Sequence, residues 1–246
     1  MTSDVRSVLG SLKELNNSNT ISINVPSLDK KVSFKHASVS QHKDLLRSAF
    51  DGVDGVINRV NILNDIITVN CNKDVNFLIT DKNAILLELR KASVGSKVKI
   101  ENVEYDLNDL PTFNQSDIKL KSTVTEDGIK VKLNVPTLST DTGINKKLGA
   151  ELAKITDQQE KLKQSIDIVV TYETSKYIDS VQIGEDVISF SEVSSYERKE
   201  LVNNLPIKLS NKILKYIGDI KAVTDRAITF EGEVMLEFDA GFLSAD

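Results

Sequence analysis

The segment from residue 97 to residue 106 fits a β-hairpin in one register, and this hairpin constrains the fold more than any other feature. In that register Val98 faces Tyr105 on one side, while Lys99 faces Glu104 on the other. Apolar pairs on one face and opposite charges on the other stabilise an antiparallel pair, and a slip of one residue would separate both sets. The opposed pairs are Ile100 with Val103, Val98 with Tyr105, Lys99 with Glu104 and Lys97 with Asp106, around a turn at Glu101 and Asn102.

A second hairpin is expected around Asp127 and Gly128, a dipeptide typical of two-residue turns. It places Val124 opposite Val131 and ends at Pro136. Further short hairpins are expected within residues 21–34 and 181–190, and around 231–232.

Helices are expected between these hairpins, because several start signals are present. Ser38 with Gln41, and Ser194 with Glu197, have the spacing of capping boxes. Thr80 is the expected N-cap of another helix. The fold class predicted from this alternation is α+β, with antiparallel β-hairpins and packed helices in two lobes.

The boundary between the lobes is expected at residues 137–145, where Ser, Thr, Asp and Gly indicate a loop. Residues 166–177 stay ambiguous, since their β-branched residues favour a strand and their flanks favour a helix. The expected organisation is a flexible N-terminal segment with a short helix and a linker (1–20), an N-terminal lobe (21–136), a linker (137–145) and a C-terminal lobe (146–246).

The composition fits a globular protein that stays in the cytosol where it is made. The chain is 40% hydrophobic and its net charge is −5. No apolar run approaches the roughly 18 residues that a membrane helix needs, and no secretion signal is found at the N-terminus.

No residue pattern indicates catalysis, a cofactor or a metal. His36 and His42 lack partners at ligand spacing, and Cys71 is the one cysteine. Residues 143–149 lack the Gly-Lys-Ser/Thr ending of a phosphate-binding loop, and residues 51–55 lack the alternating oxygen ligands of a calcium loop. We expect neither enzymatic activity nor a cofactor.

Four lysines on the polar side of the second hairpin form the main candidate for nucleic-acid contact. They would extend toward Lys97 and Lys99 if the hairpins adjoin. Neither arginine nor an exposed aromatic accompanies them, as single-strand binders require, so a solvated sheet edge is the favoured interpretation. These lysines are Lys119, Lys121, Lys130 and Lys132.

The C-terminal segment is unusually apolar, and Phe238, Phe242 and Leu243 are the candidate docking or partner-binding residues. We expect the strand ending at Phe238 to close the sheet of the second lobe. The tail 239–246 is then expected to dock Phe242, through a bend at Gly241, on that same lobe rather than on a partner.

Several motifs in the same order resemble the baseplate hub subunit and hub-assembly proteins of T-even-type contractile-tail bacteriophages. The resemblance runs over nearly the whole chain from Val25 onward, and it implies a non-enzymatic protein of the tail baseplate. The segments that carry it are 25–32, 41–46, 81–95, 129–136, 176–178, 205–217 and 238–242.

Three hypotheses remain open. The first is a hub subunit that stays in the virion and contacts other baseplate or tail proteins. The second is an assembly chaperone that leaves, and the third is a nucleic-acid-binding accessory protein. The resemblance also implies assembly in the host cytoplasm, with no membrane partner.

Overall fold

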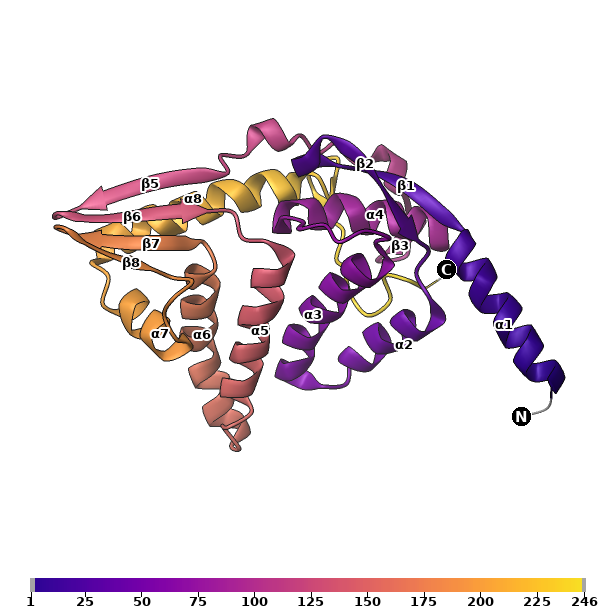
Figure 1. Cartoon of the computed structure of the whole chain (residues 1–246), viewed down its shortest axis with the longest axis horizontal. Helices are drawn as coiled ribbons and strands as arrows, with labels where there is room; N and C mark the ends of the chain where they lie inside the picture. The colour runs from indigo at the N-terminus through magenta and orange to yellow at the C-terminus, as the bar shows by residue number, and fades with distance from the viewer. Residues whose placement is uncertain (1–2, 245–246) are drawn as a thin grey trace.

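The computed structural model describes residues 3–244, and it is an α+β fold with only antiparallel strand pairs, which confirms the predicted fold class (Figure 1). The helices are α1 (Ser3–Ser18), α2 (Val39–Ser48), α3 (Gly52–Asn70), α4 (Lys82–Ser93), α5 (Leu138–Leu152), α6 (Gln158–Ser175), α7 (Ser195–Asn203) and α8 (Ile207–Arg226). The strands are β1 (Thr20–Val25), β2 (Lys30–Lys35), β3 (Lys97–Ile100), β4 (Val103–Asp106), β5 (Lys121–Glu126), β6 (Ile129–Asn134), β7 (Ile178–Ile183), β8 (Asp186–Ser189), β9 (Thr229–Phe230) and β10 (Val234–Met235). Short 3-10 turns lie at Pro26–Leu28, Ile79–Asp81, Leu107–Asp109 and Gln115–Asp117.

The β3–β4 hairpin has the predicted register, with Val98 opposite Tyr105 and Lys99 opposite Glu104. Both turn residues have positive φ, 49° and 68°, as a two-residue hairpin turn demands. Local sequence therefore determines this element completely.

The largest sheet has the strand order β5-β6-β7-β8. One row of apolar residues crosses all four strands, because Val124 pairs with Val131, Val131 with Val181, and Val181 with Ile188. Helix α8 packs against this sheet, where β5 contacts it (Figure 1). The second hairpin, expected in the N-terminal lobe, is thus paired with strands of the C-terminal lobe.

The linker expected at residues 137–145 is wrong, because these residues begin helix α5. Thr137 is its N-cap, and its side chain accepts a hydrogen bond from the backbone N–H of Thr140. The small polar residues that indicated a loop lie among Leu138, Ile144 and Leu148, which are buried. The ambiguous segment that follows is also helical, since α6 continues to Ser175.

The helix caps lie where the sequence predicts them, except that the N-cap of α4 is one residue later than expected. Both predicted capping boxes form. Helix α4 begins after Asp81 rather than Thr80, because a 3-10 turn precedes it. The buried Asp81 carboxylate accepts bonds from the backbone and hydroxyl of Ser27 at 2.8 and 2.6 Å and from the Leu78 N–H at 2.9 Å.

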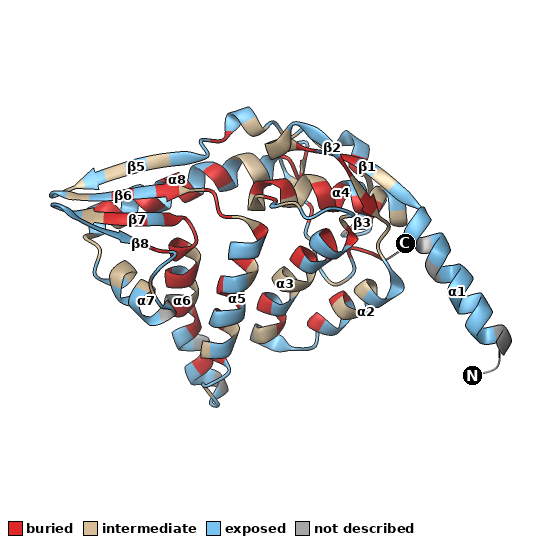
Figure 2. Ribbon diagram, viewed as in Figure 1, coloured by how far each residue is buried: buried red, intermediate tan, exposed pale blue. Residues whose placement is uncertain are grey.

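Buried apolar residues form three clusters (Figure 2). The first lies around β1–β4, α3 and α4, and it also contains Ile228, Phe230 and the C-terminal residues to Leu243. The second lies between the four-stranded sheet and α8, and the third between α3, α5 and α6. The clusters therefore divide the chain differently from the predicted lobes, since the C-terminal segment belongs with the N-terminal elements.

The N-terminal helix is longer than the short helix expected. Helix α1 extends from Ser3 to Ser18, and Asn19 alone separates it from β1, so the expected linker is absent there. Figure 1 shows α1 projecting from the body.

Candidate functional site

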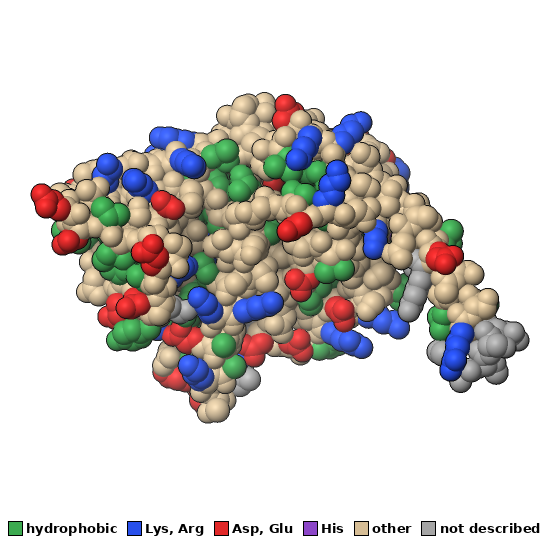
Figure 3. All heavy atoms as spheres, viewed as in Figure 1, with side chains coloured by type: hydrophobic (Ala, Val, Ile, Leu, Met, Phe, Trp, Pro, Cys, Tyr) green, Lys and Arg blue, Asp and Glu red, His purple; other side chains and the backbone are tan. Residues whose placement is uncertain are grey.

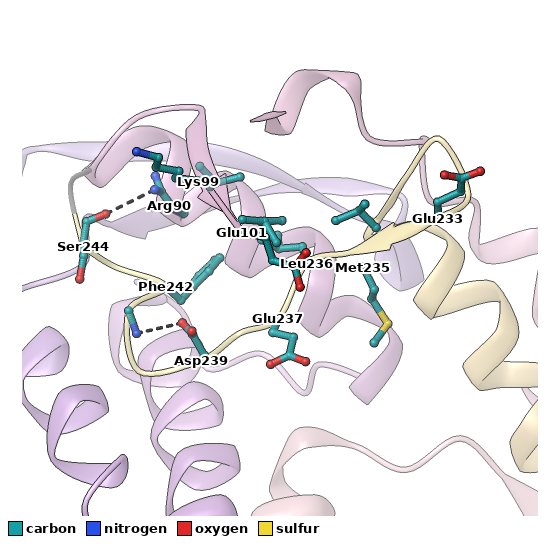
Figure 4. A pocket seen from close by; sticks show the side chains of 14 residues that line it. Arg90, Lys99, Glu101, Glu233, Met235, Leu236, Glu237, Asp239, Phe242 and Ser244 are labelled. Atoms are coloured by element: carbon teal, nitrogen blue, oxygen red, sulfur yellow. Dashed lines mark hydrogen bonds between the residues drawn. The ribbon is translucent and has the colours of Figure 1, made fainter. Parts of the chain in front are cut away.

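The C-terminal segment follows β10 and runs along β3 and α4 (Figure 4). The expected strand to Phe238 is wrong, because β10 ends at Met235 and pairs with β9 alone. After that, the backbone N–H of Leu236 bonds to the Ile228 carbonyl at 2.8 Å. The short hairpin thus carries the chain away from the four-stranded sheet.

Two of the three candidate docking residues are buried in the protein itself. Phe242 is 4% exposed and Leu243 6%, and both belong to the first cluster. Phe238 is half-buried and meets the Phe242 ring edge-on, with 4.8 Å between centroids. The tail therefore packs on its own chain, as expected, but on the N-terminal elements and not on the second lobe.

An aspartate sets the bend that directs Phe242 inward. The Asp239 carboxylate accepts a bond from the Gly241 N–H at 2.9 Å, and the Asp239 carbonyl accepts from Phe242 at 3.3 Å. Gly241 is outside the positive-φ residues, so this bend does not depend on a glycine-only conformation.

Two side chains from distant elements hold the end of the segment. Arg90, which is buried, donates to the Gly95 carbonyl at 2.6 Å and to the Ser244 carbonyl at 3.3 Å. His42 Nε2 lies 3.1 Å from the Ser244 hydroxyl oxygen. Sequence reasoning missed these contacts, since no local pattern links α2 or α4 to residues near the C-terminus.

An open groove of about 770 Å³ lies beside this segment. Its carboxylates outnumber its basic groups, and Met235 is 48% exposed among them. In the described sheets β3 and β10 each have a single strand neighbour, so each has one edge outside the sheet. Such a groove suits an extended, basic segment of another protein. Its charged lining residues are Arg90, Lys99, Glu101, Glu233, Glu237 and Asp239.

The lysine face of the second hairpin is solvent-exposed, as expected from its pattern. Lys121, Lys130 and Lys132 are exposed on β5 and β6, and Figure 3 shows basic side chains over this part of the surface. The β3–β4 hairpin belongs to another sheet, and Lys97 pairs there with Glu104 at 3.4 Å. The two hairpins therefore do not form one basic sheet.

A buried polar network connects four helices, and no sequence pattern predicts it. Lys176, the C-cap residue of α6, lies 2.6 Å from Asp141 of α5 and also pairs with Glu173. Asn64 of α3 donates to Asp141 at 2.7 Å. Burial acts to raise the pKa of Asp141, but Lys176 and Asn64 outweigh it and hold that pKa below its usual value. Burial also lowers the pKa of Lys82 on α4 to about 8, against the attraction of Asp141.

The two histidines make structural contacts. His36 Nδ1 lies 3.1 Å from the Ala92 carbonyl, and His42 contacts Ser244. Among residues 3–244 no three His, Cys, Asp or Glu side chains are grouped in a way that could hold a metal ion. None of the described helices is both long and apolar enough to cross a membrane.

Comparison with known protein families gives a match over most of the chain. A family model described as T4 bacteriophage base plate protein matches residues 18–229, which is most of the chain. No curated protein and no solved structure matches it. The matched residues include every element from β1 to α8, and therefore the whole of the four-stranded sheet. The chain belongs to the T4 bacteriophage base plate protein family, and its role is a structural or assembly role in the phage tail baseplate.

Proposed function

We propose that the protein is a non-enzymatic hub component that stays in the baseplate and acts through contacts with other baseplate proteins. The family match carries the baseplate role. The hub assignment rests on the ordered motifs that resemble hub subunits and hub-assembly proteins. Assembly takes place in the host cytoplasm, where the other baseplate proteins are made.

The groove beside the C-terminal segment is the surface that we assign to a baseplate partner. Glu233 and Glu237 line it and are exposed, and residues of β3 and β10, each of which has a single strand neighbour in the described sheets, also line it. An extended basic segment would satisfy both features, because carboxylates attract it and strand edges bond its backbone.

Mass spectrometry of purified virions tests the hub assignment. We expect the protein at a fixed ratio to other baseplate proteins. Absence from virions, together with co-purification with hub proteins from infected cells, would assign the chaperone role instead. Absence from virions, together with a lack of co-purification with hub proteins, would exclude both the hub role and the chaperone role.

Charge reversal tests the groove. In phage that lacks its own copy, a supplied Glu233→Lys/Glu237→Lys variant should enter the virion poorly, because it repels a basic segment. Glu185→Lys, an exposed change on the β7–β8 turn, is the matched control and should enter normally. Equal incorporation of both variants into the virion would show that the groove does not bind a baseplate partner.

A salt titration with single-stranded DNA or RNA tests the nucleic-acid alternative. Binding through the β5–β6 lysines would weaken steeply with salt. We expect no such binding at physiological salt.

A further inference from the structure

Four lysines at the β5–β6 hairpin form a basic surface, which we call the lysine face. All four are exposed, and no side chain that the structure describes forms an ion pair with any of them. By contrast, Lys212 of α8, which contacts the same hairpin, pairs with Glu126 at 2.6 Å. The lysine face therefore lacks a counter-charge within the described chain. It consists of Lys119, Lys121, Lys130 and Lys132.

Protection of a sheet edge does not explain the lysine face. Lysines on an outer strand discourage pairing with another chain, but β6 lies between β5 and β7 inside the sheet. Lys130 and Lys132 of β6 alternate with the buried Val131 and Leu133, so they project from the middle of the sheet, away from the second cluster. A broad surface of one charge suits a partner that carries the other.

The groove beside the C-terminal segment has the inverse charge pattern. Lys99 is the exposed basic residue among its carboxylates, because Arg90 is buried and donates to carbonyl groups. On the lysine face, the exposed Asp179 lines a hollow of about 500 Å³ with three of the lysines. Each surface thus carries four exposed charges of one sign and one of the other. The exposed carboxylates of the groove are Glu101, Glu233, Glu237 and Asp239.

We infer that the lysine face of one copy of this chain binds the groove of a second copy. The basic segment is then the β5–β6 hairpin, which is extended, so the contact rests on the proposed function of the groove. The two surfaces belong to different sheets, and Figure 1 shows β6 and β3 in different halves of the molecule. Because the surfaces share no residue, the contact is head-to-tail, and such contacts build rings or filaments.

Nucleic acid fits the lysine face less well than a second copy does. Asp179 lies beside the lysines and would repel phosphate groups, whereas in the groove it can meet Lys99 of the second copy. Neither an arginine nor an aromatic ring stands among the four lysines, so base stacking has no platform there.

Sedimentation of the full chain over ranges of concentration and salt tests the contact. Wild type should associate as its concentration rises and dissociate as salt is added, because salt screens exposed charges. Lys130→Glu/Lys132→Glu should weaken the association about tenfold or more, because like charges then face each other. Lys30→Glu/Lys31→Glu, an equal charge change at exposed residues of β2, is the matched control and should associate like wild type. A wild type that stays monomeric at low salt overturns the inference, and so does an equal effect of the control.

A mixture of two variants tests which surfaces meet. Neither Lys130→Glu/Lys132→Glu nor Glu233→Lys/Glu237→Lys should associate alone, because each brings like charges together. An equal mixture of the two should recover association, since every contact between unlike chains again joins opposite charges. This recovery also shows that both variants are folded. A mixture that stays monomeric overturns the inference, as does association of either variant alone.

Two outcomes separate this contact from the hub assignment. If wild type is monomeric and Glu233→Lys/Glu237→Lys still enters virions poorly, another baseplate protein binds the groove, and only the contact between copies is overturned. If wild type associates as expected but is absent from virions, the hub assignment is overturned and the contact between copies stands.

Discussion

The Lys176 ammonium lies 2.6 Å from a carboxylate oxygen of Asp141, and both side chains are buried. The pair joins α5 to α6, and Asn64 extends it to α3. A buried ion pair contributes little net stability over an apolar pair, but a single buried charge left behind is costly.

Lys176→Met should therefore lower the free energy of unfolding by about 3–5 kcal/mol, because it leaves the Asp141 carboxylate buried without its cation. The double variant Lys176→Met/Asp141→Asn should lose less than the single one. Urea unfolding measures both. Equal losses in the two variants would show that the charge on Asp141 is not the cause.

Lys82→Met should stabilise the fold at pH 7 by on the order of 1–3 kcal/mol, because burial disfavours the Lys82 ammonium. The pKa of Lys82 falls from 10.5 to about 8 on folding. Between these values the unfolded chain holds a proton that the folded chain has released, so wild-type stability rises with pH relative to the variant. The advantage of Lys82→Met should be full below pH 8 and shrink toward pH 10.5. Lys215→Met, an exposed change, should show no such trend in urea unfolding.

Phe242→Ala should cost about 3–5 kcal/mol, since it opens a cavity in the first cluster. Met235→Ala, at a residue that is 48% exposed, should change stability by about 0.5 kcal/mol or less. A chain that stops at Asp239 should lose at least as much as Phe242→Ala. Thermal or urea unfolding of the three variants is the measurement. An unaffected truncated chain would contradict the packing of this segment.

Adjacent residues on β3 should respond in opposite ways. Lys99→Ala should change stability by about 0.5 kcal/mol or less, because Lys99 is exposed and the ion pair of Glu104 is made by Lys97. Val98→Ala should cost more, since Val98 is buried. A larger loss for Lys99→Ala than for Val98→Ala would show that the hairpin has its faces reversed.

The hairpins and capping boxes could be predicted from sequence because their signals are local. The β3–β4 register needs only residues 97–106, and each capping box needs four consecutive residues. Helix α5 was missed because its first turns use Thr, Ser, Asp and Gly, and only the spacing of Leu138, Ile144 and Leu148 indicates a helix.

The site around the C-terminal segment could not be predicted, because its contacts are distant in sequence. His42 reaches Ser244 across 202 positions, and Asn64 reaches Asp141 across 77. The apolar residues Phe242 and Leu243 indicated docking, but nothing in their pattern identifies the elements on which they pack.

The packing of the C-terminal segment also sets an order on folding during synthesis. The buried residues of the second cluster lie between Ile118 and Ile220, so all of them have been synthesised before the first cluster is complete. The first cluster begins at Ile23 and is complete only with Leu243. While the chain is still on the ribosome, the sheet of β5–β8 can therefore fold before the body that precedes it in sequence. Part of the apolar surface of the first cluster then stays exposed to solvent until the β9–β10 pair and Phe242 have been synthesised and pack on it.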